Sequence, residues 1–194
     1  MMPKDHCMHI TPQGWLHPAT HTPSPNHDPR PPGVVPELIV IHAISLPPGQ
    51  FGGPWIDQLF TNALDPAEHP YFEQIHTLRV SAHLLVRRDG SLVQYVPFGE
   101  RAWHAGVSRF AGRERCNDFS IGIELEGADD SPFAAVQYER ASQVIGVLEQ
   151  AYESLRGRPV VGHSDIAPGR KTDPGPCFDW QRFEACLGRP CRRG

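Results

Sequence analysis

A loop near the C-terminus brings together three side-chain types that suit metal-assisted hydrolysis. Residues 161–176 carry an imidazole at His163, an ammonium at Lys171 and a carboxylate at Asp173, after a short apolar run typical of a strand end. Lys171 is one of only two lysines in a chain that otherwise uses arginine. An ammonium is a compact point charge, which suits developing negative charge on a substrate oxygen. The loop therefore predicts an active site.

A metal ion would join these residues into one site. Zinc in hydrolases takes three ligands of the His, Asp or Glu type and leaves one position for water. A second imidazole is available at His42, which closes the apolar, β-branched run 38–41 and so ends a predicted buried strand. Each histidine alone is equally consistent with a hydrogen-bonded structural residue. With Asp173 and Lys171 beside them, His42 and His163 favour a metal site.

A general base is predicted on another strand. Residues 120–127 alternate strictly, so that three apolar side chains share one face and Glu124 and Glu126 share the other. Metal-assisted hydrolysis needs a carboxylate that is not itself a ligand to take a proton from water. Periodicity does not separate the two glutamates. A solvent-facing acidic residue is the alternative for at least one of them.

Other reactive side chains compete for these roles. His83 falls in a predicted hairpin strand and His104 in a loop, and both are expected to be hydrogen-bonded structural residues. Asp165, two residues after His163, is likewise not expected to bind the metal. Cys116 has no histidine partner visible in sequence, which argues against a nucleophilic thiol.

Length and charge exclude some classes of partner. The 194 residues predict one domain with a full hydrophobic core, and the net charge of -4 offers no basic field for nucleic acid. The first residues lack the apolar region of an export signal, and no stretch approaches a membrane span. We therefore expect a cytoplasmic protein without a membrane partner. The absence of a surplus apolar stripe favours a monomer.

The elements that position these residues alternate along the chain. The patterns predict strands over 38–41 and 120–127, a hairpin over 81–96, and helices over 54–63, after Ser131 and Pro132, and from Asp179 to Gly188. No glycine-rich phosphate loop follows any strand. The fold class is therefore α/β, of the α+β type, with a central mixed β-sheet flanked by helices.

Five stretches of the chain resemble one known family. They are residues 40–53, 78–83, 101–106, 112–127 and 162–175, within a likeness that runs from about Trp15 to Trp180. The chain is similar to the AmpD family, the cytosolic 1,6-anhydro-N-acetylmuramyl-L-alanine amidases of peptidoglycan recycling. These belong to the zinc N-acetylmuramoyl-L-alanine amidases, which share an architecture with phage lysozyme-type amidases and peptidoglycan recognition proteins.

The resemblance implies a role for each site residue. His42, His163 and Asp173 would bind Zn²⁺, Glu124 would be the base, and Lys171 would stabilise the tetrahedral intermediate. The implied reaction is hydrolysis of the amide that joins the lactyl group of 1,6-anhydro-N-acetylmuramic acid to L-alanine in an anhydro-muropeptide. The predicted organisation is a flexible tail over 1–22, the zinc amidase domain over 23–188, and a C-terminal tail over 189–194.

Substrate anchors are expected close to this site. Arg79 and Arg115 could each grip a stem-peptide carboxylate in two places, and Trp103 could offer an apolar face to the sugar ring. Solvated arginines and a core tryptophan are the plain alternatives.

Two other functions remain open from the sequence. A module that binds muropeptide without cutting it would lack a ligand, the glutamate or the lysine, and all five positions are filled. A structural metal domain would need a fourth protein ligand. Ala43 departs from the family's pattern, in which we expect asparagine, and so removes a hydrogen bond beside the metal.

Overall fold

The centre of the fold is a mixed β-sheet. The structure, a computed structural model, describes residues 8–191 of the chain. The sheet has six strands in the order β12-β5-β11-β6-β7-β3, of which the first four run parallel. β7 pairs antiparallel with β6, and β3 pairs parallel with β7. The six strands are β3 (Thr20–His21), β5 (Leu38–Ile44), β6 (Leu84–Val86), β7 (Leu92–Gln94), β11 (Ser120–Glu126) and β12 (Val160–Gly162). The predicted central mixed sheet is confirmed.

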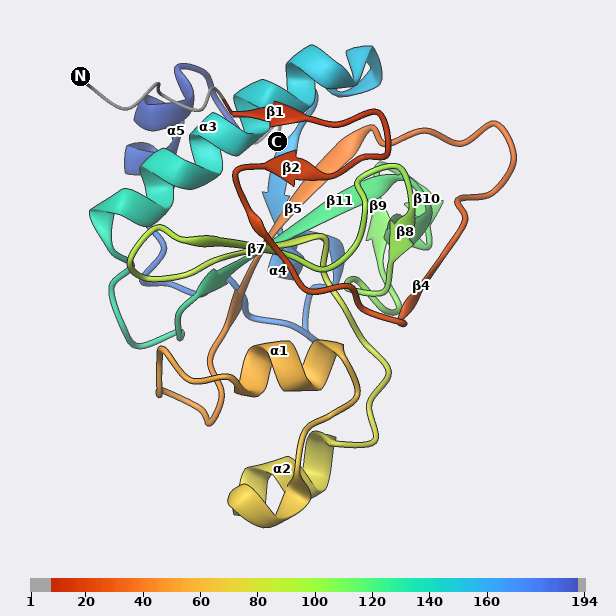
Figure 1. Cartoon of the computed structure of the whole chain (residues 1–194). Coiled ribbons are helices and arrows are strands. Elements are labelled where there is room, and N and C mark those ends of the chain that lie inside the picture. The colour runs from red at the N-terminus through yellow and green to blue at the C-terminus, as the bar shows by residue number, and fades with distance from the viewer. Residues whose placement is uncertain (1–7, 192–194) are drawn as a thin grey trace, which may run out of the picture.

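Two helices cover one face of this sheet. α3 (Ala135–Ala151) and α5 (Trp180–Leu187) lie side by side against it (Figure 1). The predicted stripe of α3 packs on the odd-numbered residues of β5 and β11 in the largest core cluster. α5 begins after Asp179 and ends at Gly188, as predicted. The predicted start of α3 at Ser131 is wrong, because its N-cap is Ala134, where the Gln137 side chain accepts from the backbone N–H.

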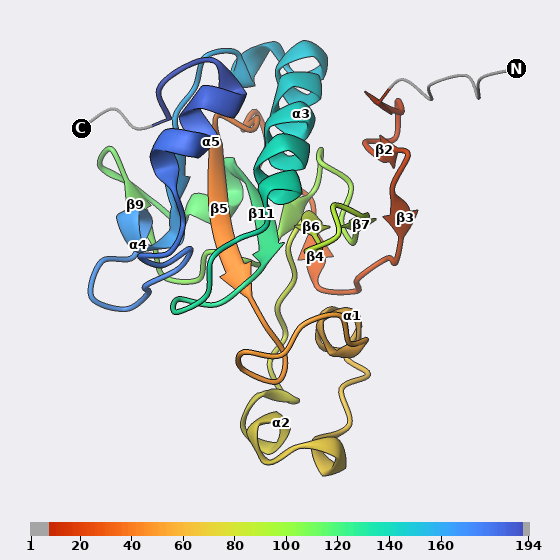
Figure 2. The same cartoon turned by 90° about the vertical axis from the view of Figure 1, so that its left-hand side faces the viewer.

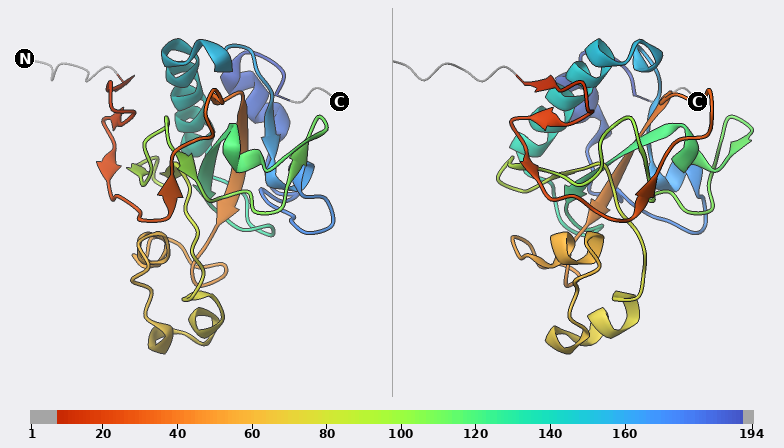
Figure 3. Two further views of the ribbon diagram at one scale, coloured as in Figure 1. Left: turned by 90° about the vertical axis from the view of Figure 1, so that its right-hand side faces the viewer. Right: turned by 45° about the vertical axis from the view of Figure 1, so that its right-hand side comes forward.

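Three short helices lie at the carboxyl ends of the parallel strands or on the opposite face. They are α1 (Trp55–Phe60), α2 (Pro70–Ile75) and α4 (His163–Ile166). β5 and β11 point toward α1, and α2 lies beyond it (Figures 2 and 3). The apolar side chains of α1 and α2 form a second core cluster with Leu85, Val93 and Tyr95 of the hairpin region. The strand ends therefore open into a space that α1 and α2 border.

Short pairings and turns complete the chain. The predicted hairpin is present as β6 and β7, with Gly90 at φ 83° in its turn. The remaining short elements are β1 (His9–Ile10), β2 (Leu16–His17), β4 (His27–Asp28), β8 (Arg101–Ala102), β9 (Arg109–Phe110), β10 (Arg113–Glu114) and 3-10 helices at Pro66–Glu68, Cys116–Asp118 and Glu153–Leu155.

Both predicted tails extend too far into the domain. Leu16 is 0% exposed within the main core, and its backbone N–H donates to the Gln94 side chain. Cys191 is 1% exposed and its backbone N–H donates to Glu184. Residues 8–22 and 189–191 are thus part of the folded domain. Their anchoring partners lie far along the chain or in another element, so local composition does not reveal them. Residues 1–7 and 192–194 of the predicted tails lie outside the described residues.

β11 is buried on both faces, as is typical of a central parallel strand. Its alternation of isoleucine and glutamate therefore distinguishes two covered faces rather than a core face and a solvent face. A solvent-facing position is wrong for both Glu124 and Glu126. Over residues 8–191, no helix combines the length and the apolar character needed to cross a bilayer.

The substitution Leu16→Ala tests the anchoring of the N-terminal segment. It should lower the free energy of unfolding by about 2–5 kcal/mol, because it leaves a cavity in the main core. The matched control Leu78→Ala makes the same chemical change at a side chain that is 46% exposed and should cost roughly 0.5 kcal/mol or less. Urea denaturation followed by circular dichroism measures both. Equal losses in the two variants would mean that residues 8–22 do not belong to the core.

Candidate active site

The register of three parallel strands places the predicted residues together. On β11, Glu124 is directly opposite His42 on β5. On the other side of β5, Gly162 of β12 pairs with Ile41, so that His163 follows at the same edge of the sheet. Both histidines are almost fully buried. Two residues that are more than a hundred positions apart thus become neighbours through backbone pairing.

The predicted ligand atoms converge on one point. His42 Nδ1 lies 3.0 Å from His163 Nδ1 and 3.0 Å from Asp173 Oδ2, and His163 Nδ1 lies 3.1 Å from the same oxygen. His42, His163 and Asp173 are the group of three within the described residues that could hold a metal ion. Four-coordinate zinc with bonds of about 2.0–2.2 Å separates its ligand atoms by roughly 3.3 Å. The three donors therefore fit the ion in type and in spacing.

The electrostatics keep His42 and Asp173 in the forms that bind a metal. Burial lowers the pKa of His42 to about 4, opposed by Asp173. Burial also raises the pKa of Asp173, but its contacts with His163 and His42 outweigh this and the net shift is downward. A neutral imidazole and an ionised carboxylate are thus present near neutral pH, as metal binding requires.

The structure separates the two glutamates that periodicity left equivalent. Glu126 accepts hydrogen bonds from the backbone N–H groups of Gly52 and Arg88, so its carboxylate is committed to the fold. Oε2 of Glu124 has no hydrogen-bond partner within residues 8–191 although the residue is 8% exposed. Burial and the charge of Asp173 raise the pKa of Glu124 well above its usual value, while Lys171 lowers it. Glu124 is therefore the glutamate that is available for proton transfer.

Glu124 and the ligand residues line one end of a cleft of about 750 Å³, together with the exposed Lys171. The other end is apolar and comes from the segments around α1 and α2. It is lined by Leu46, Leu59, Phe60, Tyr71, Ile75, Leu78 and Val80. The cleft therefore offers one reactive end and one end suited to apolar parts of a ligand.

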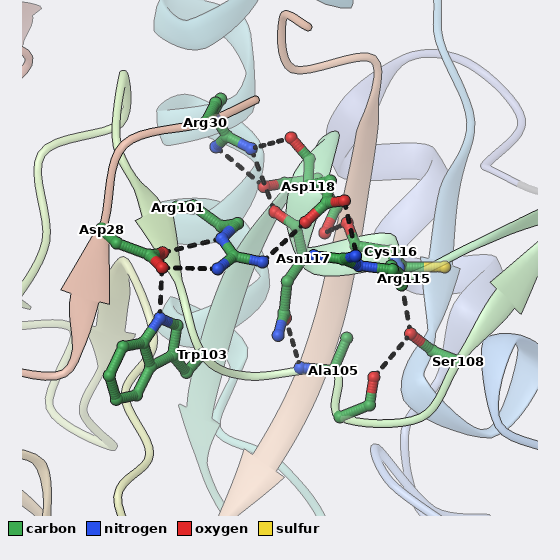
Figure 4. A network of polar contacts seen from close by, with 12 residues as sticks. Asp28, Arg30, Arg101, Trp103, Ala105, Ser108, Arg115, Cys116, Asn117 and Asp118 are labelled. Carbon is green, nitrogen blue, oxygen red and sulfur yellow. Dashed lines mark hydrogen bonds and ion pairs between the residues drawn. The ribbon is translucent and has the colours of Figure 1, made fainter. Parts of the chain in front are cut away.

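Trp103 lines the same cleft, and a hydrogen bond to Asp28 fixes the position of its indole ring. Its indole Nε1 donates to Asp28 Oδ1 at 3.1 Å, and Arg101 binds both oxygens of that carboxylate (Figure 4). No sequence pattern indicated a role for Asp28, because it lies in a proline-rich segment without a regular period. Only the β4–β8 pairing brings Asp28 opposite Arg101.

The two predicted arginine anchors do not line this cleft. The guanidinium of Arg79 is exposed and donates to carbonyl groups of its own segment. Arg115 pairs with Asp118 at 3.3 Å and lines a separate cavity of about 490 Å³. The structure brings neither guanidinium to the ligand cluster, and a role in substrate binding stays a prediction for both.

The rival residues have structural partners. His83 Nδ1 accepts from the backbone N–H of Gly122, and its Nε2 donates to the Glu100 carbonyl. Asp165 accepts from the backbone N–H of Gly162. Burial raises the pKa of the Cys116 thiol, which opposes a nucleophilic role. His104 is not in the ligand cluster, but its ring contacts His42, and burial lowers its pKa well below the usual value.

Comparison with known proteins gives consistent matches over most of the chain. Residues 31–176 match the family described as N-acetylmuramoyl-L-alanine amidase. The 1,6-anhydro-N-acetylmuramyl-L-alanine amidase AmpD of Enterobacter cloacae is 60% identical over 174 residues, which cover 90% of this chain and 92% of that protein.

Solved structures agree in fold. The crystal structure of a selenomethionine derivative of AmpD has a TM-score of 0.88 and 57% identity, and it covers 92% of this chain and 99% of its own. The Escherichia coli amidase AmiD in complex with anhydro-N-acetylmuramic acid-L-Ala-D-γ-Glu-L-Lys has a TM-score of 0.55 and 27% identity, covering 95% of this chain and 66% of its own.

The substitution Glu124→Gln should change the pH dependence of stability in the metal-free protein. The pKa of Glu124 is raised in the folded state, so its contribution is fully present below the unfolded value near 4.5 and is lost as the pH rises through the folded value. Glutamine does not ionise, and the variant should therefore be more stable than the parent near pH 8. Urea denaturation from about pH 5 to about pH 8 measures the difference.

The matched control is Glu126→Gln on the same strand. Its carboxylate accepts backbone hydrogen bonds, so this variant should be less stable at every pH. A parallel pH dependence for Glu124→Gln and the parent would contradict the unpaired, desolvated state of Glu124.

Proposed function

This chain belongs to the N-acetylmuramoyl-L-alanine amidase family and is an enzyme of that class, and we propose that it hydrolyses the lactyl amide bond between 1,6-anhydro-N-acetylmuramic acid and L-alanine of a stem peptide. We further propose that it acts with one zinc ion held by His42, His163 and Asp173. The observation that carries the proposal is the convergence of three donor atoms beside Glu124, whose Oε2 has no hydrogen-bond partner among residues 8–191, at one end of a cleft.

The relatives support this choice of substrate. The Enterobacter cloacae relative is named for the anhydro-muramyl amide, and it matches nine tenths of this chain. The AmiD structure was solved with an anhydro-muramyl peptide. In this chain, the apolar end of the cleft and the held Trp103 offer surfaces for a sugar ring and for apolar parts of the stem peptide. Cytoplasmic location, the monomeric state and participation in peptidoglycan recycling remain predictions.

The reaction follows from the side chains at the reactive end. Zinc, when bound, would lower the pKa of a water molecule and polarise the amide carbonyl. Glu124 takes the proton of the attacking water, because it is unpaired and desolvated beside the ligands. The protonated Glu124 then gives this proton to the departing nitrogen of L-alanine, which leaves as an amine. The ammonium of Lys171 faces the negative charge that develops on the carbonyl oxygen.

A non-catalytic binding module is less consistent with this arrangement. Such a module has no use for an unpaired buried carboxylate, which destabilises the fold. A structural metal site would need a fourth protein ligand, and the cluster found among residues 8–191 has three.

Removal of the metal should abolish cleavage, and added Zn²⁺ should restore it. Mass spectrometry of anhydro-muropeptide digests would show the free stem peptide and anhydro-N-acetylmuramic acid as products. A parallel digest of intact murein sacculi tests the preference for the small substrate. Full cleavage of the muropeptide after removal of the metal by a chelator would reject the zinc mechanism. Cleavage of sacculi but not of anhydro-muropeptide would reject anhydro-muropeptide as the substrate.

The substitution Lys171→Met tests the charge at the oxyanion. It keeps the length of the side chain and removes the ammonium, so kcat should fall by about 100-fold to 1000-fold. Zinc content should be unchanged, because Lys171 is not in the ligand cluster. The neighbouring exposed residue offers the control Thr172→Ala, which should keep the parent rate. Unaltered kcat in Lys171→Met would exclude the assigned role.

A further inference from the structure

The ring of His104 links His42 to the backbone of a neighbouring segment. The Ser120 hydroxyl donates its single proton to the Cys116 carbonyl at 2.6 Å. Ser120 Oγ therefore accepts from His104 Nε2, which lies 3.1 Å away. A neutral imidazole has only one N–H, so His104 Nδ1 is an acceptor and receives the proton of His42 Nε2 at 2.8 Å. His42 Nδ1 is then left without a proton, and it is the atom that lies in the ligand cluster.

Ala105, the residue after His104, fixes the position of the proton on His163. His163 Nε2 lies 3.2 Å from the Ala105 carbonyl oxygen, which only accepts hydrogen bonds. The proton of His163 is therefore on Nε2, and its Nδ1 is free to bind a metal. Arg170 donates to the same carbonyl at 2.7 Å and so fixes its direction, while its distance to His163 Nε2 is longer, at 3.5 Å.

The 104–105 segment is itself clamped in place. Asn117 Oδ1 accepts from the backbone N–H of His104 at 3.1 Å and of Ala105 at 2.7 Å, and Figure 4 shows Asn117 reaching Ala105. On the other side, the His104 ring lies directly on β11. A Cβ atom at Gly122 would come within 2.5 Å of His104 Cγ, so only glycine leaves room for the ring. The segment therefore has little freedom to shift.

We propose that the 104–105 segment, clamped by Asn117, sets the tautomer of both histidine ligands, so that each presents an unprotonated Nδ1 to the metal. This inference rests on the proposed zinc site. His104 and Asn117 are positioning residues in this proposal, because they act through the ligands. One short segment serves both ligands, through a side chain for His42 and through a carbonyl group for His163. Loss of such supporting contacts typically weakens metal affinity by about 10-fold to 100-fold.

Zinc affinity of His104 variants tests the proposal. In a chelator competition assay, His104→Leu should bind Zn²⁺ about 10-fold to 100-fold more weakly than the parent, because it offers no acceptor to His42 Nε2. In His104→Asn the amide oxygen takes the place of the ring Nδ1, so most of the affinity should return. Parent-like affinity in His104→Leu, or an equal loss in both variants, would overturn the proposal.

A matched pair of serine variants tests the same contact without replacing the buried imidazole ring of His104 by another side chain. Ser120 and Ser108 are both buried and both bond the backbone of Cys116, but only Ser120 contacts His104. Ser120→Ala should weaken zinc binding, and Ser108→Ala should not. Equal affinities in the two variants would show that the contact with His104 has no effect on the ligands.

The tautomers are measured directly in the zinc-bound protein, where the metal and not a proton lies between the two Nδ1 atoms and Asp173 Oδ2. Long-range ¹H–¹⁵N correlation spectra should show His42, His104 and His163 with the proton on Nε2. Ser120→Ala should move population toward the Nδ1–H form of His104, and Ser108→Ala should leave the spectra unchanged. An Nδ1–H tautomer for His42 or His163 in the parent would overturn the proposal.

These measurements separate the inference from the proposed function. A parent protein that binds Zn²⁺ with the expected tautomers but does not cleave muropeptide would reject the zinc amidase mechanism and leave the orienting role of the segment supported. A parent that binds Zn²⁺ and cleaves muropeptide, with full affinity retained in His104→Leu, would reject the orienting role alone.

Discussion

The backbone register between β5 and β11 is the constraint on which the site depends. It places His42 directly opposite Glu124, and the pairing of β12 with β5 brings His163 to the same edge. Because parallel strands end together, their carboxyl ends gather side chains from distant parts of the chain. A shift by one residue would turn His42 toward the core face that α3 covers. The positions of His42, Glu124 and His163 therefore follow from the pairing of these strands.

Burial gives the two glutamates of β11 different uses. Both are removed from water, but Glu126 accepts hydrogen bonds from backbone N–H groups, whereas Glu124 has an oxygen without a partner in the described part of the chain and a raised pKa. A desolvated carboxylate near a metal is a strong acceptor, and it reduces the stability of the fold at neutral pH. The cleft thus combines three converging donor atoms, which we propose as metal ligands, with one carboxylate oxygen that has no hydrogen-bond partner among residues 8–191.

Much of the architecture was predictable from local patterns. The apolar run 38–41, the Asp-Gly hairpin and the helix between Asp179 and Gly188 carry their own signals of period and capping. The predicted tails were wrong over residues 8–22 and 189–191, because Leu16 and Cys191 are held by partners that no local pattern shows. Asp28 was missed for the same reason. Arg79 and Arg115 were predicted beside the site from their residue type, and only the folded structure shows that they do not line the cleft.

The sequence alone determined which chemistry was available: two imidazoles, an aspartate, a lysine and an acidic strand, each at the end of a recognisable element or beside one. The tertiary structure alone decided which atoms meet, which glutamate lacks a hydrogen-bond partner among residues 8–191, and that the ring of His104 contacts His42 outside the cluster of three candidate ligands. The reason is physical. Residue type and period are local properties of the chain, whereas distance, desolvation and hydrogen-bond partners arise only when strands and loops far apart in sequence pack together.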